Sequence, residues 1–168
     1  LWVGGQGGIA SLDEATGKFR RRSFAGYARG DDIRYLHVDR RGTLWAASSG
    51  GLHRVDPVTM ESHTYRHDPL NPGSLADNVV RPLLEDSHGR LWVGTFNGLD
   101  LLDRRTGTFR HFRHKPGDPH SLSHDEVHYL LEDRRGILWV GTAGGLNRMT
   151  VAADGNATFE RHTASDGM

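Results

Sequence analysis

The stretch 130-LLEDRRGILWVGTAGGLNRM-149 contains the pattern that decides the fold of this chain. An apolar run ends at Asp133, and Gly136 follows in the same turn. This is typical of a tight hairpin, because the carboxylate accepts hydrogen bonds from turn N–H groups and glycine adopts positive φ. LWVGT then predicts a strand, and the pair Gly144-Gly145 predicts a second turn. The stretch therefore predicts antiparallel strands joined by short turns.

The same pattern recurs along the chain at spacings of 43, 47 and 47 residues. Each copy contains one of the four tryptophans of the chain, directly after a leucine: Trp2, Trp45, Trp92 and Trp139. The half that precedes the tryptophan is present in three copies, as LHVDRRGTLW, LLEDSHGRLW and LLEDRRGILW, and is lacking in the first. A four-stranded unit with a period of about 45 residues is typical of a β-propeller blade.

The repeat predicts an all-β chain of β-propeller blades, each a four-stranded antiparallel sheet. Closely spaced turns and the absence of helical periodicity support this interpretation. We expect a partial blade at 1–24, which begins at its second strand, and complete blades at 33–66, 80–113 and 127–162. The tail HTASDGM resembles a connection into another blade, so the sequence predicts a fragment of a larger propeller.

The recurring Leu-Trp pairs are interpreted as core residues. Buried tryptophans chiefly supply apolar area, and repetition in every blade favours packing between neighbouring blades over a sugar-stacking platform.

The glycine-rich stretches GGQGG (4–8) and GTAGG (141–145) superficially resemble a phosphate-binding loop. Such a loop needs a helix N-terminus directly behind it, where backbone N–H groups meet the anion. Here the following residues, IASL and LNRM, continue as strands. We therefore interpret both stretches as hairpin turns.

Composition excludes several classes of partner. The 21 basic and 21 acidic residues balance, so no strong field attracts nucleic acid or anionic lipid. No apolar run approaches the roughly 20 residues of a membrane span, and no signal peptide opens the chain. The absence of cysteine suits either the cytosol or the periplasm. No cofactor and no direct membrane contact of this segment are expected.

Eleven histidines raise the question of a metal site. His120, His124 and His128 are spaced by four residues and would share one face of a helix, as zinc ligands do. The repeat instead places them in a connection between blades and at the entry to a strand. The sequence therefore predicts a solvated loop and no metal site. A pH-responsive role remains conceivable because histidine titrates near pH 6.5.

Polar residues recur where each blade begins, on the strand expected to lie nearest the central axis. Alignment by the tryptophans places three of them at one level and three more three residues further on, which suits a polar ligand or partner at the channel rim. Loop capping and water-filled channel lining are the alternative. The candidate binding residues are Asp31, Asn78 and Asp125, then Arg34, Arg81 and His128.

The pattern D-x-x-G-x-LWVGT-x-x-GL, with an intervening DPLNPGSLADNVV (68–80) or DPHSLSHDEVH (118–128), resembles the two-component regulator propeller repeat. This resemblance covers nearly the whole chain. It implies a segment of the periplasmic sensor part of a bacterial hybrid two-component histidine kinase, with a carbohydrate as a plausible signal. The segment itself is expected to be non-catalytic, and the kinase lies outside it.

Two other functions remain open. The propeller could act purely as a scaffold for dimerisation and partner docking, or, as in some propellers, as a lyase or hydrolase. No catalytic triad or paired-carboxylate pattern is evident in the sequence.

Self-association is also expected. An incomplete ring leaves apolar blade faces exposed, and monomeric proteins seldom tolerate a large exposed apolar surface. The open blade edges are therefore predicted to pair with another copy of the chain.

Overall fold

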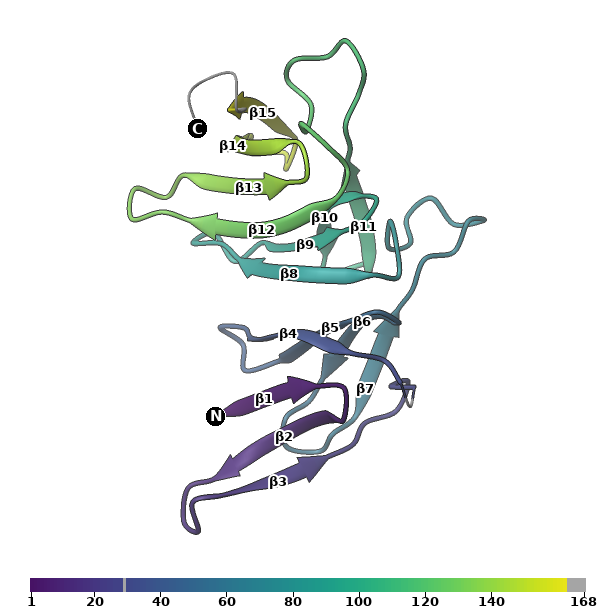
Figure 1. The fold of residues 1–168 in the computed structure, drawn as a ribbon, viewed down its shortest axis with the longest axis vertical. Coiled ribbons are helices and arrows are strands. Elements are labelled where there is room, and N and C mark those ends of the chain that lie inside the picture. Colours follow the sequence, from purple (N-terminus) through teal and green to yellow (C-terminus); the bar gives the residue numbers. More distant parts are fainter. Residues whose placement is uncertain (29, 163–168) are drawn as a thin grey trace.

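The computed structural model describes residues 1–28 and 30–162. Within these ranges the regular structure consists of β-strands arranged in four separate sheets (Figure 1). The first sheet has three strands, in the order β1-β2-β3, and each of the other three has four strands in sequence order. The all-β prediction of a partial blade followed by three complete blades is therefore confirmed.

The strands of the first two sheets are short and follow one another closely in sequence. The three-stranded sheet contains β1 (Trp2–Gly5), β2 (Gly8–Asp13) and β3 (Lys18–Arg22). The next sheet contains β4 (Ile33–Val38), β5 (Leu44–Ser48), β6 (Gly51–Val55) and β7 (Ser62–Tyr65).

The last two sheets repeat this plan. One contains β8 (Val80–Glu85), β9 (Leu91–Thr95), β10 (Gly98–Asp103) and β11 (Thr108–Phe112). The other contains β12 (Val127–Glu132), β13 (Leu138–Thr142), β14 (Gly145–Val151) and β15 (Ala157–His162).

The hairpin between the first two strands of each complete blade has the predicted chemistry. Asp86 accepts hydrogen bonds through Oδ1 from the N–H groups of His88 and Arg90, at 2.9 and 3.0 Å. Gly89 has φ 76°, in the left-handed region that glycine adopts without strain. The equivalent aspartates, Asp39 and Asp133, bind their own turns in the same way.

The second turn of each blade also requires glycine. Gly98 has φ 117°, and a Cβ placed on it would lie 2.6 Å from the carbonyl oxygen of Phe112. Both glycine-rich stretches lead into strands, at Gly8 and Gly145, and not into helices. The interpretation of these stretches as hairpin turns is confirmed.

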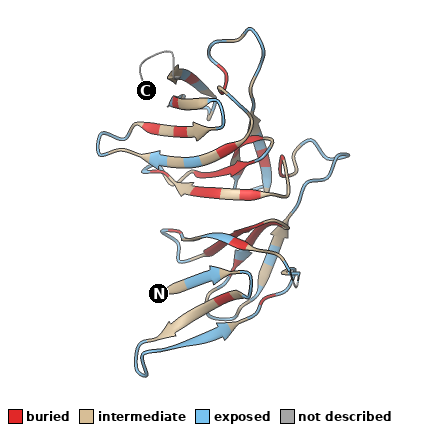
Figure 2. Ribbon diagram, in the orientation of Figure 1, coloured by how far each residue is buried: buried red, intermediate tan, exposed pale blue. Residues whose placement is uncertain are grey.

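The core lies between neighbouring sheets, and Figure 2 shows many of the buried residues on the strands of the complete blades. Trp45 is 2% exposed and clusters with Leu83, Leu91 and Phe109 of the following blade. Trp92 is fully buried and clusters in the same way with Leu138 and its neighbours. The predicted packing of the indoles between blades is therefore confirmed for these two tryptophans.

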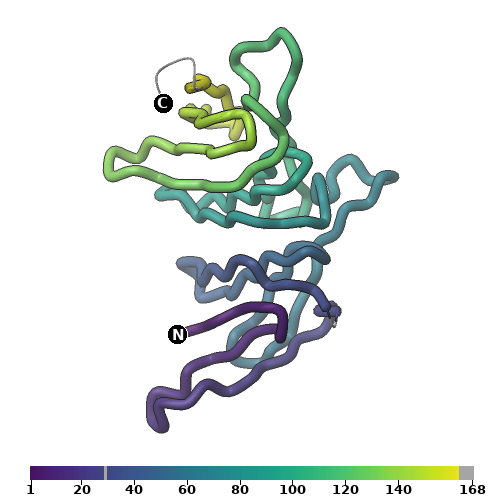
Figure 3. The backbone as a smooth tube through the Cα atoms, viewed as in Figure 1, coloured from purple at the N-terminus to yellow at the C-terminus, as the bar shows by residue number. Residues whose placement is uncertain are grey.

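The first strands of the complete blades lie side by side, with β8 between β4 and β12. Long connections, visible in Figure 3 as the loops that project from the sheets, carry the chain from the outer strand of one blade to the inner strand of the next. They span residues 66–79 and 113–126. This topology places equivalent residues of β4, β8 and β12 next to one another. The surface that these three strands form is called the inner wall below.

Candidate functional site

The inner strands are irregular at one common level. The pairing of β4 with β5, of β8 with β9 and of β12 with β13 shifts register near the start of each inner strand. The residues inside the shifts are Arg34, Arg81 with Pro82, and His128. A bulge bends its strand and re-aims side chains, and it also tolerates a proline because the ladder is already interrupted there. Three predicted site residues therefore occupy equivalent bulges.

These bulges border a hollow of about 390 Å³ on the inner wall. Its lining comes from β4, β8 and β12, so three blades contribute to one site. Its lining combines charged, aromatic and apolar side chains. The lining residues are Arg34, Tyr35, Arg81, Pro82, His128, Tyr129 and Leu130.

Arg81 is the most constrained polar residue of the hollow. Its guanidinium lies over the ring of Phe96, 4.3 Å from the centroid, and its Nη1 donates to Nδ1 of His128 at 2.8 Å. Because a guanidinium only donates, Nδ1 must be the acceptor, and the proton of the neutral imidazole is on Nε2. Nε of Arg81 is buried without a hydrogen-bond partner among the described residues.

Two carboxylates stand beside the other polar residues. Nε of Arg34 lies 3.4 Å from Oδ2 of Asp32, and both side chains are more than one third exposed. Nε2 of His128 lies 3.7 Å from Oε1 of Glu126. The exposed ion pair between Arg34 and Asp32 contributes little to stability, so it leaves the side chain of Arg34 free to rearrange around a ligand.

The other three predicted residues bind connection backbone. Asn78 accepts a hydrogen bond from the N–H of His67 at 2.8 Å, and Asp125 accepts one from the N–H of His114 at 2.6 Å. Asp31 accepts one from the N–H of Ala28 at 3.2 Å. None of the three lines the hollow. The structure thus brings Arg34, Arg81 and His128 together and places Asp31, Asn78 and Asp125 as caps of the connecting loops.

Sequence reasoning missed the aromatic part of the hollow. Tyr35 and Tyr129 are 45% and 76% exposed, each directly after a predicted site residue. Alignment of the repeats by their tryptophans could have indicated these residues, since the two tyrosines and Pro82 share one position of the repeat. The sequence did not indicate that a predicted site residue and the residue directly after it both face the hollow, because consecutive residues of a regular strand point to opposite sides of the sheet.

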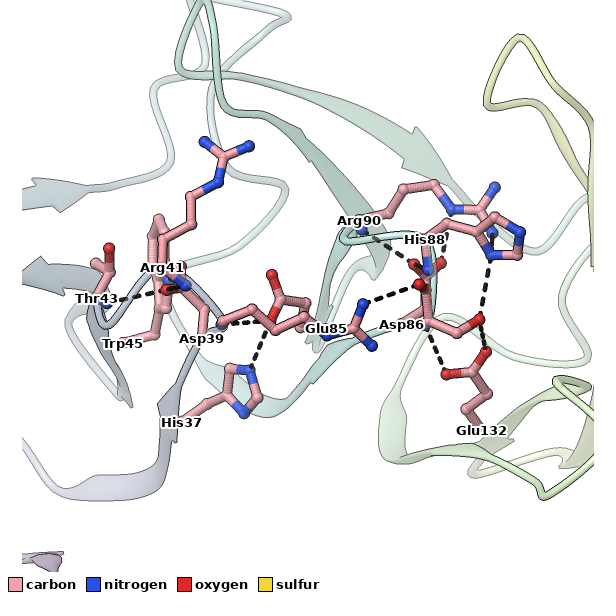
Figure 4. A network of polar contacts seen from close by, with 12 residues as sticks. His37, Asp39, Arg41, Thr43, Trp45, Glu85, Asp86, His88, Arg90 and Glu132 are labelled. Carbon is pink, nitrogen blue, oxygen red and sulfur yellow. Dashed lines mark hydrogen bonds and ion pairs between the residues drawn. The ribbon is translucent and has the colours of Figure 1, made fainter.

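A second polar cluster joins the blades to one another (Figure 4). Oδ2 of Asp86 accepts a hydrogen bond from Nε1 of Trp92 at 2.8 Å, and Asp39 binds Trp45 at the same distance. The glutamates that precede Asp86 and Asp133 reach the previous blade: Glu85 accepts from the N–H of Arg40 at 2.8 Å, and Glu132 accepts from the N–H of Ser87 at 2.7 Å. The Glu-Asp pair therefore links two blades and one indole.

Asp39 is the most perturbed carboxyl of this cluster. Burial alone would raise its pKa, but hydrogen bonds from Trp45 and Arg104 outweigh burial and lower the pKa from 3.8 to about 2. Arg104 also donates to Glu85 at 2.9 Å, so one guanidinium binds both carboxylates. Both carboxylates of this arrangement have a charged partner at the blade interface, which favours a structural role.

Buried polar residues of the third strands hold the connections. Asp100, fully buried, accepts through Oδ2 from the N–H of Ala76 at 2.8 Å. Asn147, at the equivalent position of the next blade, accepts from the N–H of Ser123 at 2.9 Å. Asp100 also binds Nδ1 of His111 at 2.6 Å. Sequence reasoning missed this position because its residue type changes from blade to blade.

The three regularly spaced histidines do not share a helix. His120 and His124 lie in the connection before β12, and His128 lies on β12. In the described parts of the chain, no group of three histidine or acidic side chains is arranged to hold a metal ion. Within residues 1–28 and 30–162, no helix has the length and apolar character to cross a membrane.

Comparison with protein families and curated sequences gives two results. Residues 74–97 and 121–144 match the model of the two component regulator propeller. Each matched segment begins in a connection and ends in the second turn of a blade, so it includes the aspartate and glycine of the first turn and the tryptophan. The search of curated proteins found no match.

Solved structures match over most of the chain. The extracellular domain of a hybrid two component system from B. thetaiotaomicron has a TM-score of 0.73 at 23% identity, over 96% of this chain and 21% of that one. PorZ, a surface component of the type-IX secretion system of Porphyromonas gingivalis, has a TM-score of 0.55 at 26% identity over 80% of this chain and 18% of that one. The chain therefore spans about a fifth of the length of either solved chain.

An enzyme also has this fold. Virginiamycin B lyase from Staphylococcus aureus matches 91% of this chain and 48% of its own, with a TM-score of 0.63 at 12% identity. An identity this low reflects the shared architecture alone.

The aligned blades, the Asp-Trp turns and the two matched segments lead to one conclusion. This chain has a β-propeller fold, and its segments 74–97 and 121–144 match the two component regulator propeller repeat.

Proposed function

We propose that the chain is a ligand-sensing segment of an extracytoplasmic propeller receptor, and that it binds a carbohydrate in the hollow between β4, β8 and β12. The observation that carries this proposal is the convergence of Arg34, Arg81 and His128 on one hollow of about 390 Å³. Ligand sites are typically concave, with a few polar groups that converge on one point.

Aromatic and polar groups of the hollow suit a sugar. The exposed ring of Tyr129 offers an apolar face for the C–H groups of a pyranose, and its hydroxyl remains a hydrogen-bonding group. Arg34 and His128 supply donors for hydroxyl oxygens. A site of this composition can orient a pyranose ring and distinguish its substituents by hydrogen bonds.

Signal relay is proposed to use the blade interfaces. The ligand would touch three neighbouring blades, whose spacing is held by Glu85 and Glu132 as they bind the turns of the preceding blades. A ligand that binds one blade spacing more tightly than another would increase the population of the spacing that it prefers. The two-component repeats support a signalling output by a kinase elsewhere in the protein. They also support a periplasmic location of this segment.

Isothermal titration with a panel of neutral and acidic oligosaccharides tests the site. We expect at least one to bind, and the Tyr129→Ala variant to weaken that binding by about tenfold, as for loss of a stacking contact and its hydrogen bond. Leu70→Ala, which removes an apolar side chain that is 92% exposed in a connection, is the control and should bind like the wild type. A panel without a binder, or equal losses in both variants, would refute the site.

A second function, assembly with a partner or another copy, is favoured by the exposed apolar residues of the terminal blades. Val3 and Phe19 of the first blade and Leu131 of the last are 42%, 51% and 59% exposed. The similarity to PorZ, a component of a secretion machine, supports a scaffolding role as an alternative. The proposed function includes no catalytic step.

A further inference from the structure

The hollow on the inner wall has an imbalance of charge. Arg34 and Arg81 both line it, whereas no aspartate or glutamate is part of the lining. The nearest carboxylates, Asp32 and Glu126, stand at the margin and interact with Arg34 and His128. Among the described residues, no carboxylate forms an ion pair with Arg81.

Two other part-buried arginines are paired with carboxylates. Arg104 binds both Asp39 and Glu85, and Arg90 binds Asp86 at 2.6 Å. Arg81 instead meets a neutral imidazole through one donor and the face of Phe96 through its plane. A guanidinium has five donors, and its strongest partners are oxyanions bound by two donors at once.

The position of Arg81 is fixed before any ligand arrives. Stacking on Phe96 at 4.3 Å and the 2.8 Å bond to His128 restrict its rotamers. A preorganised side chain loses less conformational entropy when it binds, so more of the interaction appears as affinity. Nε of Arg81 also has no hydrogen-bond acceptor among the described residues, so the donors of its guanidinium are not all used within the chain.

We propose that this hollow is specific for an acidic sugar, in which a negatively charged oxygen group on the ring binds Arg81 and Arg34 while the ring lies against Tyr129 or Tyr35. This inference rests on the proposed function and specifies its ligand class. The recognised chemistry is an oxyanion next to a pyranose face. A uronic acid and a sulfated sugar both provide it.

A neutral sugar fits the same hollow less well. Its hydroxyl groups can accept from the two arginines, but hydrogen bonds with an ionised partner are roughly twice as strong as neutral ones. A neutral ligand also displaces water from the guanidinium groups without compensating their charge, and this desolvation opposes binding. The preference for an anion follows from these two differences.

Three monosaccharides that differ only at carbon 6 provide matched probes: D-glucuronate, D-glucose 6-sulfate and D-glucose. Each is titrated to millimolar concentration into the ¹⁵N-labelled chain at constant ionic strength, and backbone amide shifts are followed by NMR. We expect glucuronate, the sulfate or both to shift the amides of Arg34, His128 and Tyr129, and to bind at least tenfold more tightly than glucose. A response to glucuronate alone would assign a carboxylate, and a response to both a general oxyanion.

Variants connect this preference to the arginines. Arg81→Gln and Arg34→Gln should each weaken binding of the acidic probe by about tenfold, the effect of losing a charge-assisted hydrogen bond. Arg105→Gln removes a highly exposed arginine of a turn outside the hollow and should leave binding unchanged. The amide spectrum of each variant reports whether it has folded.

Two results would overturn the inference. Glucose binding as tightly as the acidic probes would refute the charge preference and leave a neutral carbohydrate site intact. Acidic probes that shift no amide of the hollow would refute recognition of an oxyanion, while the oligosaccharide panel decides separately whether the site binds sugar.

Discussion

Asp86 shows how much one side chain of the repeat does. Its Oδ1 closes the turn through two backbone N–H groups, and its Oδ2 accepts from Nε1 of Trp92 and Nε of Arg90 at 2.8 and 2.6 Å. The carboxylate is fully buried, and the indole donor it binds is buried with it. Removing the carboxylate would leave the indole N–H without its acceptor inside a blade interface.

We therefore expect Asp86→Ala to lower the free energy of unfolding by about 3 kcal/mol, since a buried polar group without a partner costs about 1–3 kcal/mol and the turn loses its bonds as well. Urea denaturation monitored by tryptophan fluorescence measures the change. Asp103→Ala is the control, because Asp103 accepts from the N–H of Arg105 in an exposed turn. A loss for Asp86→Ala no larger than for Asp103→Ala would contradict this role.

At the scale of single elements, the inner strands show what the sequence could and could not predict. Alignment by tryptophan correctly placed Arg34, Arg81 and His128 at one level, because a 47-residue period preserves register between the complete blades. The bulges at these residues were not predicted, since an interruption of pairing depends on the partner strand as well as on local sequence. Without the bulges, the contribution of Tyr35 and Tyr129 to the hollow could not be inferred.

The connection before β8 is held by the pair of His111 and Asp100. Nε2 of His111 donates to the carbonyl oxygen of Pro72 at 2.8 Å, and Nδ1 shares a hydrogen bond of 2.6 Å with Oδ1 of Asp100. The hydrogen bond with Asp100 is the main cause that raises the pKa of His111 above 6.5. Burial raises the pKa of Asp100, and its hydrogen bonds with His111 and Ala76 oppose that effect.

This pair predicts a pH dependence of stability. Because the pKa of His111 is higher in the folded state, its contribution is fully present below about pH 6.5 and is lost as the pH rises through the raised value. Urea denaturation from pH 6 to 9 should therefore show a falling free energy of unfolding. His111→Gln and Asp100→Asn should both flatten this slope, and a slope that persists in both variants would exclude the pair as its source.

Contacts between blades give a further prediction at this scale. Glu132 reaches back from β12 to the N–H and the hydroxyl of Ser87. Glu132→Ala should lower the free energy of unfolding by about 1 kcal/mol, because the lost bonds are partly replaced by water at this exposed turn. Glu160, 63% exposed and 3.4 Å from Arg148, is a control whose replacement by alanine should change stability by less than about 0.5 kcal/mol. If urea denaturation showed the same decrease in the free energy of unfolding for both variants, the contact of Glu132 with the preceding blade would not contribute to stability.

For the whole molecule, the sequence predicted the architecture much better than the site. The same structural pattern occurs in four copies of the repeat. The blades, the turns and the indole packing could therefore all be predicted from Trp45, Trp92 and their equivalents. A ligand site depends on how the copies differ. His53, Asp100 and Asn147 are fully buried at one position of three blades, yet their side chains differ, and only coordinates reveal what each one binds.

The two terminal blades have complementary apolar faces. Leu131 and Trp139 are paired across β12 and β13, and Leu84, which is equivalent to Leu131, packs against the next blade. On the first blade, Val3 and Phe19 are equivalent to Val93 and Phe109, which are buried against the preceding blade. A second copy placed head to tail would repeat the packing that already joins the blades within the chain.

We accordingly expect self-association through these faces, with a sedimentation coefficient that increases with concentration in the range of tens of micromolar. Leu131→Glu and Phe19→Glu should each shift the chain to monomer, because each places a charge in an apolar interface where its desolvation is not compensated. Leu70→Glu changes an apolar residue that is 92% exposed in a connection, away from both faces, and should associate like the wild type. A wild type that sediments as a monomer throughout this range, or association that survives both face variants, would exclude head-to-tail pairing.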